Sequence, residues 1–179
     1  MSITAIAAAA LLLGITGGLQ TTSDALEQEI ARGMAQQLMD EVLGARYMAV
    51  GESPYNTHLS RSLYESLGSG RERYNDVDDY NGLRIQPPED LWGVELGSDD
   101  GEGDLRHPAF RGPAGFFDQW RQKIDVYYVS PANPAVRLPA GEVSDYRAIE
   151  VRIDRVDPER GSRQLARLRR VVAYVPPLL

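Results

Sequence analysis

The chain has 179 residues, 42% of them hydrophobic, with a formal net charge of −7 and no cysteine. This length allows one modest domain, and the acidic balance argues against nucleic acid as a partner, because phosphates are bound by clustered Lys and Arg. The lack of cysteine excludes disulfides, thiolate catalysis and Cys-ligated zinc.

Residues 1–19 contain no charged side chain. A helix over this segment would be about 28 Å long, close to the ~30 Å hydrocarbon core of a bilayer. We therefore expect a transmembrane helix over 1–19, with a cleaved signal peptide and a buried helix as alternatives. A signal peptide is disfavoured because no Lys or Arg precedes Arg32. Gly14 and Gly18 form a small-xxx-small pair, which lets another helix approach closely.

Residues 20–50 are predicted to form an amphipathic helix that continues the first one. Apolar residues recur about every four positions, and acidic and amide residues fill the other side. No Pro or Gly pair interrupts the chain between Leu19 and Ser23. The apolar stripe that is expected to face a core consists of Leu26, Ile30, Met34, Leu38, Met39, Val42 and Leu43.

Residues 51–122 are predicted to be rich in loops, because Gly, Pro, Asp and Asn interrupt every periodic pattern except a short helical one at 59–67. Two acidic stretches are the only candidate metal sites, and their oxygen ligands would suit Ca²⁺. The first opens as D-x-D but has Asn81 where an EF-hand requires Gly. Asp and Gly are also ordinary turn residues. The candidate calcium ligands are Asp76, Asp78, Asp79, Asp99, Asp100 and Asp104.

Residues 123–179 show the period-two alternation of strands, at 123–129, 146–153 and 165–175. The segment 157–161 (DPERG) is a good hairpin turn between the last two. An antiparallel meander of three strands, with a fourth left open, needs a cover for its apolar face, and the stripe of the 20–50 helix is the only long one. The predicted fold class is therefore α+β, with a long N-terminal helix packed on a small C-terminal antiparallel meander.

No catalytic constellation is recognisable in the sequence. The only two histidines, His58 and His107, lie in loop-like segments, and no nucleophile elbow, Walker loop, dinucleotide fingerprint or H-E-x-x-H occurs. The sequence therefore predicts a protein that is not an enzyme, with Ca²⁺ as its only candidate cofactor.

In order and proportion the chain resembles the type IV pilin-like family, which includes minor pilins and the pseudopilins of type II secretion. Two phrases carry the resemblance, residues 31–45 (ARGMAQQLMDEVLGA) and 75–82 (NDVDDYNG). The resemblance implies a structural subunit of a pilus-like or pseudopilus filament, with the bilayer, other pilin-like subunits and the assembly machinery as partners. It also implies an inner-membrane anchor and an extracytoplasmic β-domain.

The prepilin-type leader and the Glu-containing start of that family do not precede Met1. We therefore expect the sequence to lack the leader and first mature residues of a longer product. The alternative function is a membrane-tethered or secreted β-rich domain that binds a ligand or partner without polymerising.

Overall fold

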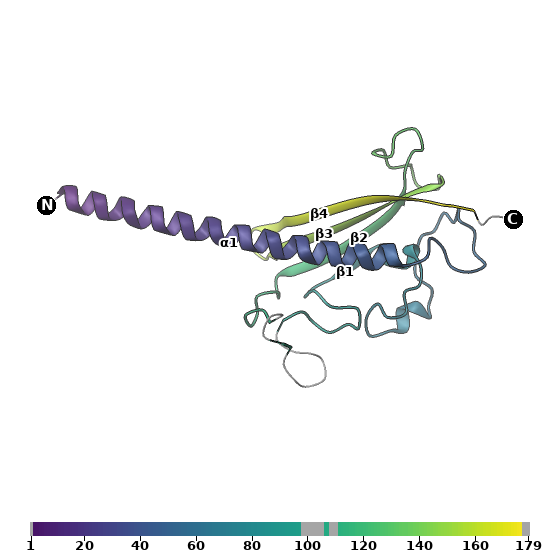
Figure 1. Cartoon of the computed structure of the whole chain (residues 1–179), viewed down its shortest axis with the longest axis horizontal. Helices are drawn as coiled ribbons and strands as arrows, with labels where there is room; N and C mark the ends of the chain where they lie inside the picture. Colours follow the sequence, from purple (N-terminus) through teal and green to yellow (C-terminus); the bar gives the residue numbers. More distant parts are fainter. Residues whose placement is uncertain (1, 98–105, 108–110, 177–179) are drawn as a thin grey trace.

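One long helix packs on a four-stranded antiparallel sheet (Figure 1). The computed structural model describes residues 2–97, 106–107 and 111–176, and the side chains of the helix from Gly18 onward. The expected α+β layout is confirmed, and the sheet has the fourth strand that the sequence left open. Its elements are α1 (Ser2–Gly44), the 3₁₀ helices η1 (Glu65–Leu67) and η2 (Val77–Tyr80), and strands β1 (Leu83–Ile85), β2 (Trp120–Tyr128), β3 (Tyr146–Asp157) and β4 (Gly161–Ala173), paired in that order.

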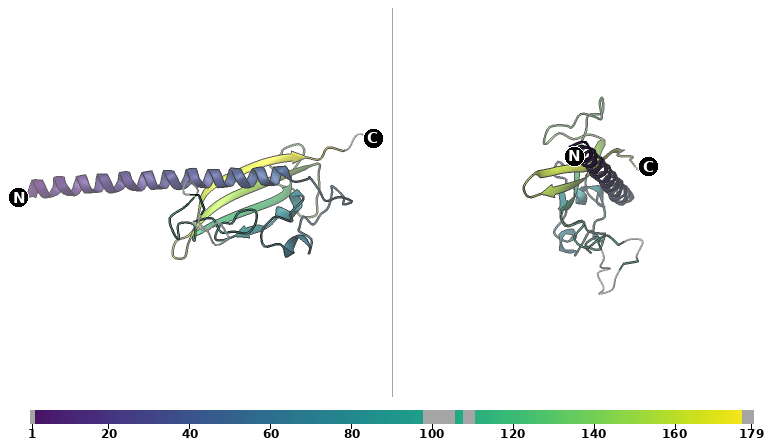
Figure 2. Two further views of the ribbon diagram at one scale, coloured as in Figure 1. Left: turned by 60° about the horizontal axis from the view of Figure 1, so that its bottom comes forward. Right: turned by 90° about the vertical axis from the view of Figure 1, so that its left-hand side faces the viewer.

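Helix α1 runs without a break over 43 residues, about 65 Å at 1.5 Å per residue. Its N-terminal half projects beyond the sheet, and only its C-terminal half lies along β3 and β4 (Figures 1 and 2). The helix ends at Gly44 because the backbone that follows pairs elsewhere. The Arg46 N–H donates to the Asn75 carbonyl at 3.1 Å, and the Val77 N–H donates to the Arg46 carbonyl at 2.9 Å. Over the side chains that are described, no helical stretch is long and apolar enough to cross a membrane.

The buried side of α1 only partly matches the predicted stripe. Leu26 and Leu43 were expected to face the core, but they are 59% and 41% exposed. Successive helix residues are separated by 100°, and the side that meets the sheet is centred on Ala31, Ala35 and Leu38, from which both leucines point away. The other stripe residues are partly buried (Ile30) or buried (Met34, Leu38, Met39 and Val42).

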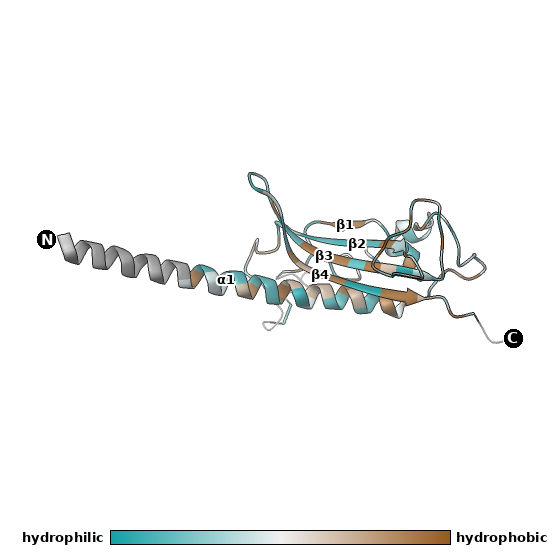
Figure 3. Cartoon of the chain, turned by 90° about the horizontal axis from the view of Figure 1, so that it is seen from above, coloured by the Kyte–Doolittle hydropathy of each residue, from teal (hydrophilic) through white to brown (hydrophobic). Residues whose placement is uncertain are grey.

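The sheet packs its apolar side chains against α1. Figure 3 shows how hydrophobic and hydrophilic residues are distributed along the described part of α1 and along the strands. The predicted inward positions of β2 and β3 are buried in the core: Ile124, Val126, Ile149, Val151 and Ile153. Beside them, Phe116 and Phe117 stack on Trp120, with ring centroids 5.4 and 5.3 Å from its ring. These three aromatic residues anchor the loop region to the sheet, whereas Trp92 is 65% exposed.

The β3–β4 hairpin closes through the predicted turn. Asp157 Oδ1 accepts hydrogen bonds from the backbone N–H groups of Glu159 (2.8 Å) and Arg160 (3.0 Å). Gly161 follows at φ +83°, a conformation that favours glycine. The hairpin is held to the helix because the buried Glu27 carboxylate accepts hydrogen bonds from both Arg155 and Arg163.

Candidate functional site

The aspartates of the 75–82 segment are buried and build the 3₁₀ helix η2. Asp76 Oδ1 accepts a hydrogen bond from the Asp78 N–H at 2.8 Å. Asp79 Oδ2 accepts from the backbone N–H groups of Asn75 at 2.8 Å and Asp76 at 3.2 Å. Asp76 and Asp79 thus cap the helix reciprocally, as in a capping box. Their carboxylates satisfy backbone donors that would otherwise be buried without partners.

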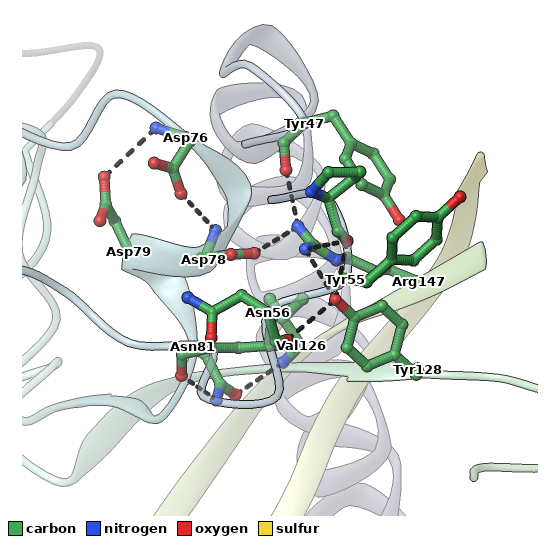
Figure 4. Close-up of polar contacts among 12 residues, drawn as sticks. Tyr47, Tyr55, Asn56, Asp76, Asp78, Asp79, Asn81, Val126, Tyr128 and Arg147 are labelled. Carbon is green, nitrogen blue, oxygen red and sulfur yellow. Dashed lines mark hydrogen bonds and ion pairs between the residues drawn. The ribbon is translucent and has the colours of Figure 1, made fainter. Parts of the chain in front are cut away.

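Asp78 instead pairs with Arg147, a fully buried residue near the start of β3 (Figure 4). Arg147 Nη1 donates to Asp78 Oδ1 at 2.5 Å and to the Tyr47 carbonyl at 2.7 Å. Its Nη2 donates to the Pro54 carbonyl and to the Tyr128 hydroxyl, both at 2.9 Å. The guanidinium also lies over the Tyr47 ring, 4.2 Å from its centroid. This Arg147 node joins η2, β2, β3 and the chain that follows α1.

Burial changes the proton affinity of the acidic groups at this node. It raises the pKa of Asp78 to about 7, although the adjacent Arg147 guanidinium opposes the change. Burial likewise raises the pKa of Asp79 to about 6, and it raises the pKa of Asp76. Arg147 keeps its charge, because arginine is not deprotonated in proteins. The folded chain therefore binds protons at this node more tightly than an exposed segment would.

Three buried carboxylates, those of Glu65, Asp76 and Asp79, offer oxygen atoms that lie within 4.8 Å of one another. Oxygen ligands at this spacing could hold a hard cation such as Ca²⁺. Each carboxylate also accepts hydrogen bonds from the chain itself; Glu65 accepts them from the Ser62 N–H at 2.7 Å and from Asn75 Nδ2 at 2.5 Å. The structure thus brings the predicted Asp76 and Asp79 together with Glu65. The third predicted aspartate of this segment, Asp78, forms an ion pair with Arg147 instead.

The structure says little about the other residues that the sequence singled out. Asp99, Asp100 and Asp104 lie outside the described residues, and so do the surroundings of Gly14. A Cβ added to Gly18 would meet open space, so none of the described side chains packs against it.

Two key residues of this site were missed from the sequence, and only one of them left a signal. Arg147 has the same parity along β3 as Ile149 and Val151, so period-two alternation places it on the buried face. A buried arginine needs a buried acidic partner, which the 75–82 segment supplies. Glu65 left no signal, because it meets Asp79 only through the tertiary path of the loops.

The 75–82 segment also binds the sheet directly. Asn81 Oδ1 accepts a hydrogen bond from the Val126 N–H at 2.9 Å (Figure 4). This bond continues the pairing of β1 with β2, because Asn81 comes just before β1 in the chain. Its Nδ2 donates to the Leu59 carbonyl at 2.8 Å. The segment therefore connects the end of the helix, the central strands and the distal loops. Its polar groups thus hold the domain together.

No family model, curated protein or solved structure matches the chain. Any function assigned to the protein has to follow from its own residues and geometry.

Proposed function

We propose that the chain is a structural subunit of a type IV pilus-like or type II secretion pseudopilus filament. In this proposal the N-terminal helix anchors the subunit in the inner membrane, and the β-domain lies outside the cytoplasm. The observation that carries it is the unbroken helix α1, half of which extends beyond the domain that it stabilises (Figure 1).

The length of the projecting half suits a membrane. The first ion pairs from α1 to the sheet are made by Asp24 and Glu27. The helical residues of the uncharged segment, 2–19, span about 27 Å, against ~30 Å for a hydrocarbon core, and residues 20–23 connect this segment to the ion pairs. The sequence places no charge within the first 19 residues. These two facts support a span that continues directly into the domain.

The side of α1 that faces away from the sheet supports lateral packing. Leu19 and Leu26, which are 66% and 59% exposed, lie one heptad apart on that side. Gly18 lies beside Leu19 with open space around its Cα. Small and apolar residues of this kind allow helices of neighbouring subunits to pack closely. Repeated head-to-tail contacts between such helices generate an open helical polymer. The function is then assembly, with the bilayer, equivalent subunits and the assembly machinery as partners.

Replacing Gly14 with Leu in the full chain tests this proposal. Overpacking costs ~1 kcal/mol or more per contact, so we expect about fivefold less sedimentable polymer from cells that assemble the filament. Alkaline extraction of the membranes should still leave the variant in the pellet. Gly44→Leu, at the opposite end of α1 where a Cβ would meet open space, is the matched control. Equal amounts of polymer from Gly14→Leu and wild type would contradict the proposal.

A second candidate is the membrane-tethered or secreted β-rich domain that binds a ligand or partner without polymerising. Four exposed apolar side chains of the loop region favour it. Leu63, Tyr64 and Leu67 are largely exposed, and so is Trp92, whose carbonyl accepts a hydrogen bond from Ser69 Oγ at 3.2 Å. Exposed apolar patches mark interaction sites. A chain that stays in the membrane pellet but never sediments as a polymer would select this candidate.

A further inference from the structure

A polar groove of about 440 Å³ lies between α1 and the β3–β4 hairpin. In this region α1 extends beyond the sheet, next to the turn that joins β3 and β4 (Figure 1). The helix contributes Gln20 and Asp24. The hairpin contributes Asp157, whose carboxylate is engaged in the turn, and three arginines, Arg155, Arg160 and Arg163.

The charges of this groove are not all engaged. The Glu27 carboxylate binds Arg155 and Arg163, so these three groups largely satisfy one another. Oδ1 of Asp24 accepts two long hydrogen bonds from Arg163, both at 3.4 Å, while the Asp24 side chain is 46% exposed. The guanidinium of Arg160 forms no hydrogen bond or ion pair with any residue that the structure describes. The groove therefore presents an available cation on the hairpin and an available anion on the helix.

We propose that this groove binds the headgroup of a zwitterionic phospholipid with a primary ammonium, that is, phosphoethanolamine. The guanidinium of Arg160, with Arg163 beside it, binds the phosphate, and the Asp24 carboxylate accepts a hydrogen bond from the ammonium. The inference rests on the proposed function, because it requires that residues 1–19 lie in the bilayer.

The chemistry of the groove separates this headgroup from others. Guanidinium groups bind phosphate oxygens through charge-assisted, often bidentate hydrogen bonds. A carboxylate needs an N–H donor, which a primary ammonium has and the quaternary ammonium of choline lacks. Quaternary ammonium groups bind best over aromatic rings, and no aromatic residue is among the described residues that line the groove. An anionic headgroup without an ammonium would be repelled by Asp24.

The height of the groove matches the headgroup layer. Gln20 is the first residue after the uncharged segment, so Gln20 to Asp24 rises about 6 Å beyond the end of the proposed span. The polar layer on each side of a bilayer is ~5–8 Å thick. A lipid whose chains lie against the span thus reaches the groove with its headgroup.

The test uses the full chain in detergent with an equimolar mixture of phosphatidylethanolamine, phosphatidylglycerol and phosphatidylcholine. Native mass spectrometry reports which lipid stays bound. The wild type should retain phosphatidylethanolamine. Arg160→Ala removes one charge-assisted contact and should lower this retention about tenfold. Asp24→Asn removes both the acceptor of the ammonium and the charge that repels anionic headgroups. This variant should therefore retain phosphatidylglycerol in preference to phosphatidylethanolamine.

Two variants with the same charge changes serve as controls. Arg170→Ala removes an exposed arginine further along β4, and Asp40→Asn removes an exposed aspartate further along α1. Both should retain phosphatidylethanolamine as the wild type does. A wild type that retains the three lipids equally, or prefers phosphatidylglycerol, would overturn the inference. So would an equal loss in Arg170→Ala and Arg160→Ala. Because lipid selectivity is measured in detergent, it is separate from membrane retention and polymer formation, which test the proposed function.

Discussion

Replacement of Arg147 with Met should destabilise the domain more than any conservative surface change. Removing one partner of a buried ion pair costs ~3–5 kcal/mol, because the remaining charge is left uncompensated. The variant would leave the Asp78 carboxylate without its guanidinium and the Tyr47 carbonyl without a donor. Domains are stable by only ~5–15 kcal/mol, so this loss is about a fifth or more of the total.

Unfolding of the full chain in detergent, followed by tryptophan fluorescence, measures this loss. Trp120 is 1% exposed in the core and therefore reports on global unfolding. At about 3 °C per kcal/mol for a domain of this size, Arg147→Met should lower the Tm by about 10 °C. Arg170→Met, which changes an exposed arginine of β4, should lower the Tm by less than about 2 °C. Equal Tm values for the two variants would refute the proposed importance of the Arg147 node.

A double variant isolates the ion pair from the rest of the node. Replacing Asp78 with Leu in the Arg147→Met background removes the orphaned carboxylate, so part of the lost stability should return. The coupling energy of the double-mutant cycle should be at least ~1 kcal/mol. The single Arg147→Met variant should also lose more stability at pH 8 than at pH 5, because Asp78 is protonated at the lower pH. Additive effects, independent of pH, would show that the two side chains act separately.

Two further predictions concern the same part of the domain. Burial raises the pKa of Asp79 to about 6 and of Asp78 to about 7, above the ~3.9 of a free Asp, so the free energy of unfolding should fall as the pH rises from about 4 to about 7. Urea titrations should show this slope and its reduction in Asp79→Asn; an unfolding free energy that rises over that range would contradict it. Gly93→Ala should cost ~2–5 kcal/mol, because φ is +82° and the new Cβ would lie 2.2 Å from the Ser69 carbonyl oxygen. Gly82→Ala, at φ +77° with open space, should cost only ~1–2 kcal/mol in the same assay, and equal costs would disprove the steric argument.

Periodicity was enough to predict the amphipathic part of the helix and the long strands, and the DPERG sequence was enough to predict the hairpin turn. It failed at Leu26 and Leu43, because a four-residue repeat drifts around a helix with 3.6 residues per turn and cannot say which side meets the sheet. The short strand β1 gave too little pattern to be assigned, since it has three residues.

The candidate site was predictable only in part, for a similar reason. The 75–82 segment was found by its composition, but its role depends on partners far away in the sequence. Asp78 and Arg147 are 69 residues apart in the sequence. Before the fold is known, the only indication of their pairing is that strand alternation places Arg147 on the buried face, where it needs an acidic partner. The groove at the hairpin could not be predicted at all, because it requires the hairpin to lie beside Asp24 on α1.

Oxidative cross-linking tests the central claim, assembly through α1, most directly. The chain has no cysteine, so Leu19→Cys/Leu26→Cys introduces the only two thiols. They are about 10 Å apart along one helix, too far for a disulfide within a subunit, whose Cα atoms must lie within ~7 Å. In membranes that assemble the filament, we predict a ladder of covalent oligomers from this variant and none from the control Val50→Cys/Leu63→Cys, which places two exposed thiols at the distal end. Monomers alone from Leu19→Cys/Leu26→Cys, or the same ladder from both variants, would contradict assembly through the helix.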